Sequence, residues 1–357
     1  MERLPRYRTG DEDLDAAVEA LVDRVGPTDD AALIFEMVST VLRLARDGAD
    51  RGELKLVNAA LKEMRYSFHV FSSYRASRKA SIFGSARTRP DDPLYDQTRR
   101  LARGLAERDW MVITGAGPGI MTAGIEGAGP ESSFGVSIRL PFETVTSSFL
   151  ADDPKLINYR YFFTRKLSFV KESHGFVLLP GGFGTLDEAF ELLTLVQTGK
   201  AMPVPIVLLD VPGDTYWESW RRFVADEVVG RGYLSTGDID LVCTTGDVET
   251  AIDELTGFYS NYQSARFVRD RLVLRMKALP DPGAMDAINV AFADIVVDGR
   301  IEPSEPTPAE VADHDALDLA RLSLVFDRTR WARLRRLIDV INGRRRPEDC
   351  HPVDPGT

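Results

Sequence analysis

The stretch "GFVLLPGGFGTLDEAFELLTLVQTG", residues 175–199, decides the fold of this chain. It begins with an apolar run, residues 175–180, passes through a loop with three glycines, and continues in a helical pattern over residues 185–199. Nearly continuous apolar strands that are each followed by a helix are typical of a parallel sheet with helices on both faces. The stretch therefore predicts an α/β fold.

The same alternation recurs on both sides of this stretch. Further apolar runs stand at residues 79–85, 110–115, 133–140, 204–210 and 239–244, and helical patterns follow them at 95–109, 119–128, 158–173, 216–230 and 247–259. Together they predict a catalytic domain over residues 79–258. Before it, helical spacing predicts a helical extension, residues 1–78. Its last helix carries an apolar stripe that we expect in the core or in a subunit contact: Leu54, Val57, Leu61, Met64, Phe68 and Phe71.

Residues 259–357 break this rhythm and predict a small α+β appendage without a catalytic constellation. Residues 267–278 alternate apolar and charged side chains, as a half-exposed strand does. A helix is expected at 284–296, a strand at 319–326, and a last helix from Trp331. The proline-rich segment between these elements, residues 301–310, predicts a loop.

The composition excludes several classes of protein. The 357 residues are 44% hydrophobic and carry a formal net charge of −11, which argues against binding to nucleic acid. The polar N-terminus predicts no secretory signal, and no apolar run approaches the roughly 18 residues that span a bilayer. Cys243 and Cys350 lack metal-like or redox-like spacing, so we expect free thiols in a soluble cytoplasmic protein. The arginine-rich segment 328–347 is expected to be a solvated helix face.

Three glycine-bearing loops follow predicted strands, at the edge where the ligands of open parallel sheets bind. Glycine lets the backbone approach an anion, and the first amides of the next helix point at that anion. We therefore predict that these loops bind the phosphate of a nucleotide or of a sugar phosphate. The candidate residues are Gly84, Ser85, Gly115, Gly117, Gly119, Gly181, Gly182, Gly184 and Thr185.

The glycine spacing argues against two large classes of nucleotide-binding protein. In "GAGPGI", residues 115–120, the third glycine comes one position early for a dinucleotide fingerprint, and Arg139 stands where a ribose-binding acid is expected. The Gly-Lys pair at residues 199–200 precedes alanine and follows a helix, so it does not form an NTPase phosphate loop. A mononucleotide or a phosphorylated sugar remains.

Two charged elements each allow two interpretations. Glu188 stands three residues after Thr185, so these residues either form a helix capping box or place a carboxylate beside the bound molecule. Arg165 and Lys166 lie among aromatic residues on a predicted helix. A buried arginine usually has an anion or a carboxylate as partner, but its stem can instead pack while its head reaches water. The residues alone leave these alternatives open.

The segments "TGAGPGIM", "LPFE", "FFTRK" and "PGGFGTLDE" resemble the LOG (Lonely Guy) family of phosphoribohydrolases in its long bacterial form, historically misannotated as lysine decarboxylase. The resemblance covers residues 79–235 and includes the signature Pro-Gly-Gly-x-Gly-Thr-x-x-Glu. It implies a Rossmann-like fold, homodimers or larger homo-oligomers, and hydrolysis of the N-glycosidic bond of nucleoside 5′-monophosphates such as AMP or cytokinin riboside 5′-monophosphate. The family's catalytic arginine and glutamate fall on Arg165 and Glu188, and Lys166 joins the predicted substrate-binding residues.

A carboxylate beside the anomeric carbon suits this reaction, because positive charge develops on the ribose as the bond breaks. We expect no metal and no cofactor: the four histidines are scattered, and Lys166, Lys171 and Lys200 lack a pattern for pyridoxal phosphate. The alternative is a non-catalytic Rossmann-like carrier of a nucleotide or of the molybdenum cofactor. The expected partners are a nucleoside 5′-monophosphate and further copies of this chain, with neither nucleic acid nor membrane.

Overall fold

The computed structural model describes residues 7–26, 28, 30–139, 153–344 and 350. The chain divides into two compact units, Met1–Arg65 and Tyr66–Thr357. None of the described helices is long and apolar enough to cross a membrane.

The first unit is helical, as predicted. It contains α1 (Glu12–Asp23), α2 (Ala31–Arg46) and the first part of α3 (Arg51–Ser72), which continues into the second unit. The side chain of Asp11 accepts a hydrogen bond from the backbone N–H of Leu14 and caps α1. Of the apolar stripe on α3, only Phe71 is buried among the described residues. The expectation that the stripe lies in the core is therefore wrong for its other members, and the expectation of a subunit contact stays a prediction.

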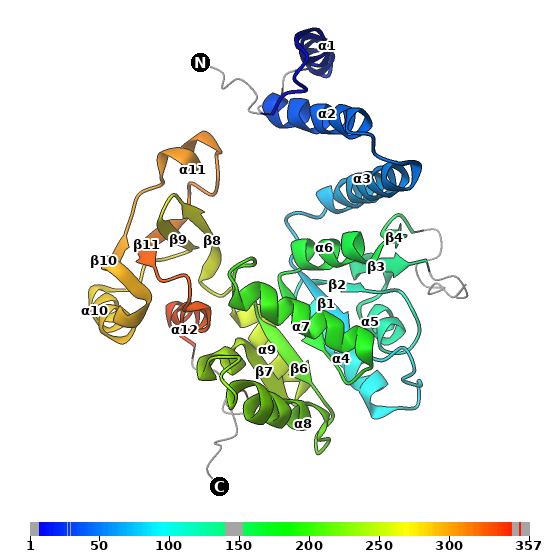
Figure 1. The fold of residues 1–357 in the computed structure, drawn as a ribbon. Coiled ribbons are helices and arrows are strands. Elements are labelled where there is room, and N and C mark those ends of the chain that lie inside the picture. The colour runs from blue at the N-terminus through cyan, green and yellow to red at the C-terminus, as the bar shows by residue number, and fades with distance from the viewer. Residues whose placement is uncertain (1–6, 27, 29, 140–152, 345–349, 351–357) are drawn as a thin grey trace. The chain divides into compact units, whose positions relative to one another are not determined.

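The second unit is built on a parallel sheet, as the alternation of strands and helices predicts (Figure 1). In the described part of the chain its order is β4-β3-β2-β1-β5-β6-β7, and every neighbouring pair is parallel. The strands are β1 (Lys79–Phe83), β2 (Met111–Thr114), β3 (Ser133–Ile138), β4 (Leu156–Tyr159), β5 (Gly175–Leu178), β6 (Ile206–Leu209) and β7 (Val242–Thr245).

Strand β4 corrects the prediction of one continuous helix over residues 158–173. Residues Leu156–Tyr159 pair with β3 at the edge of the sheet, and the helix begins only at Phe162. The strand was missed because it is four residues long and only alternate side chains are buried, Ile157 and Tyr159. A short pattern of this kind does not separate a strand from a helix end.

Helices cover both faces of the sheet, which makes the fold Rossmann-like. Alternate strand residues point to opposite faces: Ile82 packs in one hydrophobic cluster with Leu101, and the next residue, Phe83, packs in another with Leu192. Leu101 belongs to α4 and Leu192 to α7. The helices of this part are α4 (Pro93–Ala106), α5 (Ile120–Ala128), α6 (Phe162–Glu172), α7 (Phe183–Gln197), α8 (Tyr216–Phe223), which continues in a π-helical turn (Val224–Val229), and α9 (Val248–Gly257).

The order in which the strands are added changes side between β1 and β5. From β1 it proceeds to β2, β3 and β4 on one side, and it then crosses to β5 on the other side. Loops at such a switch point diverge and leave a crevice at the carboxyl ends of the strands. The loops that follow β1, β2 and β5 carry the predicted glycines, so the topology brings these loops to the same edge.

A second, antiparallel sheet follows, with strand order β10-β11-β9-β8. Its elements are β8 (Tyr262–Val268), β9 (Arg271–Met276), α10 (Pro282–Ala291), β10 (Val296–Pro303), α11 (Pro308–Ala312), β11 (Ala320–Phe326) and α12 (Trp331–Ile341). Residues 267–278 therefore form the end of β8, a hairpin turn and β9 rather than one strand. The loop predicted at residues 301–310 is confirmed only for residues 304–307, because residues 301–303 end β10 and residues 308–310 begin α11. Leu272 shares a hydrophobic cluster with Leu255 of α9. The division of the chain at residue 258 stays a prediction.

The prediction of two free thiols is wrong. Cys243 of β7 and Cys350 form a disulfide, with their Cα atoms 4.5 Å apart. They are separated by 107 residues in the sequence, so the spacing gave no indication of their proximity. Disulfides are uncommon in reducing compartments. The cytoplasmic location stays a prediction from the sequence.

The prediction of a solvated arginine face on the last helix is wrong for Arg335. This side chain is fully buried and pairs with Glu254 and Asp339. On the same helix, Arg333 pairs with Asp294 at 2.9 Å. These arginines contribute to the packing of α12, and residues 345–347 of the predicted segment lie outside the described residues.

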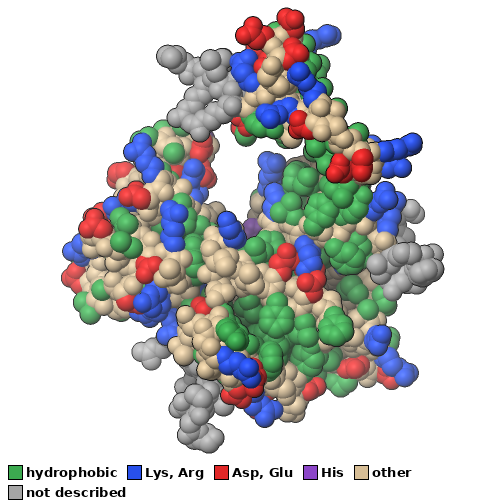
Figure 2. Space-filling model, viewed as in Figure 1, with side chains coloured by type: hydrophobic (Ala, Val, Ile, Leu, Met, Phe, Trp, Pro, Cys, Tyr) green, Lys and Arg blue, Asp and Glu red, His purple; other side chains and the backbone are tan. Residues whose placement is uncertain are grey.

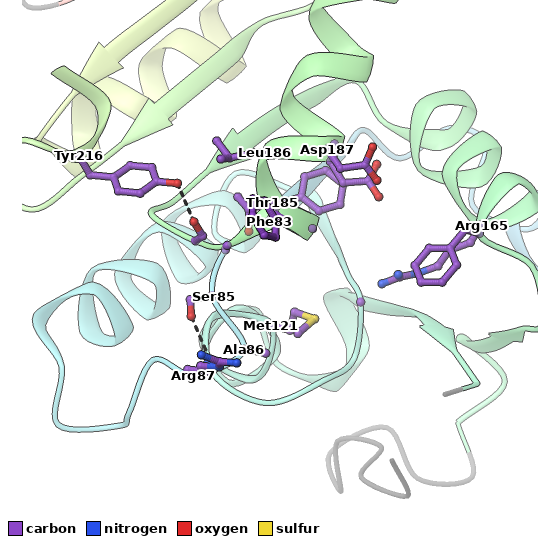
Figure 3. A pocket seen from close by; sticks show the side chains of 18 residues that line it. Phe83, Ser85, Ala86, Arg87, Met121, Arg165, Thr185, Leu186, Asp187 and Tyr216 are labelled. Carbon is purple, nitrogen blue, oxygen red and sulfur yellow. Dashed lines mark hydrogen bonds between the residues drawn. The ribbon is translucent and has the colours of Figure 1, made fainter. Parts of the chain in front are cut away.

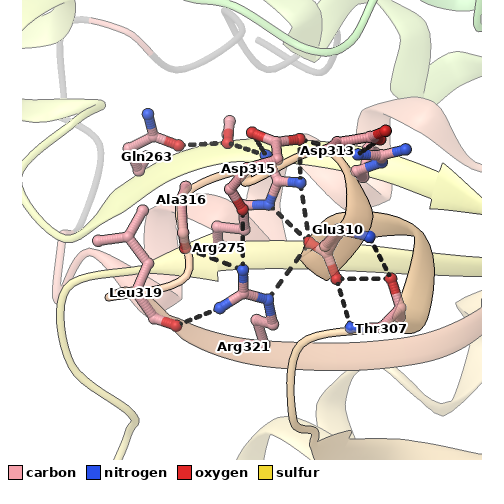
Figure 4. A network of polar contacts seen from close by, with 11 residues as sticks. Gln263, Arg275, Thr307, Glu310, Asp313, Asp315, Ala316, Leu319 and Arg321 are labelled. Atoms are coloured by element: carbon pink, nitrogen blue, oxygen red, sulfur yellow. Dashed lines mark hydrogen bonds and ion pairs between the residues drawn. The ribbon is translucent and has the colours of Figure 1, made fainter. Parts of the chain in front are cut away.

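Glu310 lies at the centre of a buried polar network in the second sheet (Figure 4). Its Oε1 accepts hydrogen bonds from the Nε atoms of Arg275 at 2.9 Å and Arg321 at 3.2 Å. Its Oε2 accepts hydrogen bonds from the N–H and the hydroxyl of Thr307, both at 2.9 Å. All three charged side chains are at most 5% exposed. Burial alone would raise the pKa of Glu310, but the Thr307 N–H and the Arg275 guanidinium lower it to about 2.

Replacing Glu310 by glutamine is expected to lower the free energy of unfolding by about 3 kcal/mol, because two buried guanidinium groups lose their shared carboxylate. The folded pKa of about 2 lies below the ordinary value of 4.5, so this stabilisation is present above pH 4.5 and is lost as the pH falls through 2. Urea denaturation at several pH values measures both effects. The control is Glu302→Gln, which breaks the exposed pair with Arg271 and should change the free energy by at most about 0.5 kcal/mol. Equal losses in the two variants would contradict the prediction.

Candidate functional site

A cavity of about 850 Å³ opens at the carboxyl ends of β1, β2 and β5 (Figure 3). Its wall contains most of the predicted site residues, from sequence segments more than a hundred residues apart. The lining residues are Phe83, Gly84, Ser85, Ala86, Arg87, Gly115, Met121, Phe162, Arg165, Gly181, Gly182, Phe183, Gly184, Thr185, Leu186, Asp187, Glu188 and Tyr216. The topology thus brings the predicted arginine, the predicted glutamate and residues of all three glycine loops into one space.

Hydrogen bonds hold two of the loops together on one side of the cavity. The backbone N–H of Ser85 donates to the carbonyl of Pro180 at 3.2 Å, and the hydroxyl of Tyr216 donates to the carbonyl of Gly181 at 2.6 Å. The hydroxyl of Ser85 accepts a hydrogen bond from the N–H of Arg87 at 3.1 Å. The loop after β1 and the loop after β5 are therefore fixed before any ligand enters.

Helix α7 begins earlier than the sequence suggests, and the capping-box interpretation is wrong. The N-cap is Gly182, and the N–H groups of Thr185 and Leu186 donate to its carbonyl. Thr185 is therefore inside the helix, and Glu188 lies in the second turn, where its carboxylate lines the cavity. The N–H groups that open the helix, at Phe183 and Gly184, have no intrahelical acceptor and lie beside the cavity. The helix start is thus suited to an anion.

Two glycines of the loop are required neither by packing nor by backbone conformation. A Cβ atom added at Gly182 or Gly184 would meet no atom within 4 Å. By contrast, a Cβ at Gly181 would lie 2.2 Å from Oγ1 of Thr185, so Gly181 permits the close packing of the turn. The open space at Gly182 and Gly184 therefore leaves room for a ligand to approach the backbone.

The predicted glycines after β2 separate into two groups. Gly115 lines the cavity, and a Cβ there would lie 2.5 Å from Nη2 of Arg165. Gly117 and Gly119 are not part of the described cavity wall. Gly119 has a φ of +68°, and a Cβ there would lie 2.4 Å from the carbonyl oxygen of Ser85. In the structure, Gly119 permits the start of α5 to pack against the loop after β1.

The Glu188 carboxylate is buried and lies among other charges on α6 and α7. Its Oε2 is 3.5 Å from Nζ of Lys166, and Lys166 also pairs with Asp187 at 2.9 Å and with Glu191 at 2.7 Å. Burial raises the pKa of Glu188, and the charges of Lys166 and Arg165 act in the opposite direction. Burial alone would lower the pKa of Lys166, but its bonds to Glu191 and Asp187 raise it. Lys166 does not line the cavity and instead holds the acidic face of α7.

Arg165 reaches the cavity from α6 on the side away from Arg87 (Figure 3). Its Nε donates to the carbonyl of Val136 at 2.9 Å, and its guanidinium stands 5.3 Å from the ring centre of Phe169. Burial lowers the pKa of Arg165, while the charge of Glu188 acts in the opposite direction. Within the described residues the two groups form no ion pair, and both line the cavity.

Several lining residues were not predicted from the sequence. Arg87, Met121, Phe162, Phe183 and Tyr216 all contribute to the wall. Four of them stand within three residues of a predicted site residue, so proximity in the sequence was a usable signal. Tyr216 is 31 residues after Thr185 and gave none. The "LPFE" segment, residues 140–143, lies outside the described residues, and among the described residues no group of acidic, histidine or cysteine side chains can hold a metal ion.

The chain is similar to proteins of one enzyme family. Residues 119–255 match the family model described as "Possible lysine decarboxylase". A cytokinin riboside 5′-monophosphate phosphoribohydrolase of Arabidopsis thaliana is 31% identical over 100 residues, which are 28% of this chain and 45% of that protein. A probable enzyme of the same name from Oryza sativa subsp. japonica is 33% identical over 91 residues, 26% of this chain and 41% of that protein. Over the matched residues the chain is similar to the LOG family.

The match to individual LOG proteins is partial. The chain spans less than half the length of the two relatives above. A longer alignment, with another LOG enzyme of Arabidopsis thaliana, covers 163 residues, 44% of this chain and 73% of that protein, at 24% identity. The model match begins at Gly119 and includes the Arg165-Lys166 pair and the glycine loop before Glu188. The match thus includes part of the cavity wall, whereas the wall residues after β1 and Gly115 after β2 precede it.

Solved structures similar to this chain include a molybdenum cofactor binding protein and a molybdenum cofactor carrier protein. The molybdenum cofactor binding protein of Rippkaea orientalis is 19% identical with a TM-score of 0.35, and the alignment covers 50% of this chain and 94% of that chain. The molybdenum cofactor carrier protein of Chlamydomonas reinhardtii is 21% identical with a TM-score of 0.31, with 49% and 94% covered. These values do not decide between an enzyme and a carrier.

Proposed function

We propose that this chain hydrolyses the N-glycosidic bond of nucleoside 5′-monophosphates, AMP or cytokinin riboside 5′-monophosphate, to a free base and ribose 5-phosphate. The main support for the proposal is the set of residues that line one cavity. A buried carboxylate, Glu188, and a guanidinium, Arg165, share the cavity with the open start of α7. Phosphoribohydrolase activity in the curated LOG relatives supports the same reaction class.

The phosphate is proposed to bind at the start of α7. The free amides of Phe183 and Gly184 and the positive end of the helix dipole favour an anion there. Gly182 and Gly184 leave the space that a phosphate needs, and Ser85 and Arg87 lie at the same end of the cavity. This placement leaves the ribose to extend along α7 toward Glu188.

The carboxylate of Glu188 is proposed to act at the anomeric carbon. It takes a proton from the attacking water, whose oxygen bonds to C1′ while the bond from C1′ to the base nitrogen breaks. The electron pair of that bond stays on the base, which takes up a proton. The negative charge of Glu188 stabilises the positive charge on the ribose in the transition state, and Arg165 orients the nucleotide against it. Each group is worth about 10²–10⁴-fold in rate.

The lysines of the chain are poorly suited to lysine decarboxylation. That reaction needs a lysine amine that forms a Schiff base with pyridoxal phosphate. Lys166, the lysine nearest the cavity wall, is held by three carboxylates, which raise its pKa and keep the amine protonated. Lys171 pairs with Glu172 on the far end of α6. We therefore retain the hydrolase and not the decarboxylase.

The direct test is incubation of the purified protein with AMP. Free adenine and ribose 5-phosphate, formed in equal amounts and separated by chromatography, are the expected products. A panel of purine and pyrimidine monophosphates then ranks the bases. Intact AMP at high protein concentration, with AMP bound, would instead favour the carrier alternative. The homo-oligomeric state stays a prediction that light scattering of the same sample measures.

Replacing Arg87 by glutamine is expected to raise KM for AMP about 10-fold with little change in kcat, because the variant loses a charge-assisted contact to the phosphate. Steady-state kinetics with AMP and with adenosine measure the effect. Because adenosine has no phosphate, KM for adenosine should be the same in the wild type and in the Arg87 variant. The matched control is Arg89→Gln: Arg89 is exposed in the same loop, pairs with Asp91 at 3.3 Å and does not line the cavity. An equal loss with adenosine would show that Arg87 does not contact the phosphate.

A further inference from the structure

Two phenylalanines in the cavity wall are exposed to solvent. Phe162 begins α6 and is 53% exposed, and Phe183 begins α7 and is 93% exposed. Figure 2 shows hydrophobic side chains gathered on the face that carries these helices. A ring exposed at the cavity wall contributes little to the fold by burial, so we look for its contribution in what it contacts when the cavity is occupied.

The helix contacts place the two rings on facing sides of α6 and α7. The Nζ of Lys166 lies 2.9 Å from a carboxylate oxygen of Asp187. Phe162 precedes Lys166 by four residues, and Phe183 precedes Asp187 by four residues. Residues four apart share one helix face, one turn of about 5.4 Å apart. Because both helices start at the carboxyl edge of a parallel sheet, both rings lie one turn toward that edge from the Lys166–Asp187 pair.

The described wall has few groups that read the edge of a base. It contains no asparagine, glutamine or histidine among the described residues, which are the neutral side chains that pair with base edges. Of its other polar side chains, Ser85 and Arg87 are assigned above to the phosphate, and Arg165 and Glu188 to the ribose. Thr185, Asp187 and Tyr216 remain. Stacking on an aromatic ring, in contrast, recognises the flat face of any base.

We propose that Phe162 and Phe183 form an aromatic clamp that holds the base of a purine 5′-monophosphate by its faces. The proposal rests on the proposed function, since it uses the same cavity and the same orientation of the nucleotide. A clamp of this kind tolerates substituents on the edge of the base and favours purines over pyrimidines, because the larger ring system stacks over more area. It also explains why the chain exposes two large rings beside a cavity whose wall holds four charged side chains.

The test measures nucleotide binding separately from turnover. Binding of AMP, UMP and ribose 5-phosphate to the Glu188→Gln protein is measured by titration calorimetry, alone and with Phe162→Ala or Phe183→Ala added. Each alanine is expected to raise the Kd for AMP about tenfold and to raise that for UMP less. The Kd for ribose 5-phosphate, which has no base, should stay within about twofold. The same substitutions in the wild-type background should raise KM for AMP by a similar factor.

The chain provides matched control phenylalanines. Phe163 is 52% exposed on the same turn as Phe162 but stacks on Tyr161 and does not line the cavity, and Phe223 is 53% exposed at the end of α8. Alanine at either position should leave the Kd for AMP unchanged. Light scattering of every variant detects a change of oligomeric state.

The outcomes separate the clamp from the hydrolase. A selective loss of AMP binding in the Phe162 and Phe183 variants supports the clamp. If the wild-type protein releases no adenine from AMP, the proposed hydrolase activity is rejected, but the clamp is still supported by this loss of binding. Equal AMP binding by the Phe162 and Phe163 variants, or equal losses for AMP and ribose 5-phosphate, overturns the clamp. A change in oligomeric state without a change in AMP affinity also overturns it, because the rings then serve a subunit contact.

Discussion

Replacing Glu188 by glutamine is expected to lower kcat/KM for AMP by about 10³- to 10⁴-fold. Glutamine keeps the size and the hydrogen-bonding capacity of the side chain but carries no negative charge. It therefore neither takes a proton from water nor stabilises positive charge on the ribose. Release of adenine, followed at saturating and subsaturating AMP, measures the loss and shows whether it lies in kcat. An unchanged kcat would remove Glu188 from the chemistry.

The structure provides a control for unfolding in the Glu188 variant. Because burial raises the pKa of Glu188 above its ordinary value, its ionised form at pH 7 does not stabilise the fold, and glutamine removes that cost. Lys166 keeps its pairs with Asp187 and Glu191. We therefore expect a free energy of unfolding within about 1 kcal/mol of the wild type. Glu191→Gln changes the same kind of charge one turn further along α7, outside the cavity wall, and should retain activity within about fivefold.

The pH dependence follows from the same environment. Glu188 must be ionised to act on water, and burial raises its pKa above the ordinary value of 4.5. The rate should therefore fall on the acid side at a pH above 4.5, because the carboxylate is protonated earlier than an exposed one. A profile of kcat/KM from pH 4 to 8 measures the midpoint. An acid limb at or below pH 4.5, or one that persists unchanged in the glutamine variant, would assign the titration to another group.

The parallel sheet could be predicted because its strands are buried on both faces. Residues such as Phe176 and Val177 point to opposite sides of the sheet and are both apolar, so the strand reads as a continuous run. Strand β4 lies at the edge and is half-buried, so its four residues carried no such signal. Local pattern thus predicts central strands better than edge strands.

The candidate site could be predicted as a set of residues but not as a geometry. The motif placed Thr185 at a helix start, whereas the helix begins at Gly182 because its carbonyl accepts the N–H groups of Thr185 and Leu186. The N-cap and the first turn each contain a glycine, Gly182 and Gly184, and glycine is a poor helix former, so propensity favoured a later start. The disulfide between Cys243 and Cys350 likewise depends on tertiary structure that the spacing does not show.

The division of roles between Arg165 and Lys166 also required the structure. The two residues are adjacent in the sequence, and their side chains leave α6 in different directions. Lys166 contacts the carboxylates of α7, whereas Arg165 is anchored to the carbonyl of Val136 and lines the cavity. A helix rotates by about 100° per residue, so the side chains of neighbouring residues leave it in different directions. The residues alone leave their roles open, and the family resemblance assigns both to the site, Arg165 as catalytic and Lys166 as substrate-binding.

Replacing Arg165 by lysine is expected to lower kcat/KM for AMP by about 10²- to 10³-fold, although the charge is kept. A lysine amine cannot donate to the Val136 carbonyl and at the same time present a planar fork of donors to the cavity. The loss should appear mainly in kcat if Arg165 orients the ribose against Glu188, and mainly in KM if it only holds the nucleotide. Steady-state kinetics with AMP distinguish the two. Arg160→Lys, an exposed position two residues before α6, is the control and should keep wild-type rates.

A second variant tests the position of Arg165 without changing its chemistry. A Cβ atom at Gly115 would lie 2.5 Å from Nη2 of Arg165, so Gly115→Ala forces the guanidinium to move. We expect this variant to lose about 10-fold or more in kcat/KM, since a displacement of about 1 Å in a positioned group costs up to 10²-fold. Combined with Arg165→Lys, the alanine should add little, because both changes disturb one group. Fully additive losses would show that Gly115 and Arg165 act independently and that the guanidinium is not held in place by the loop after β2.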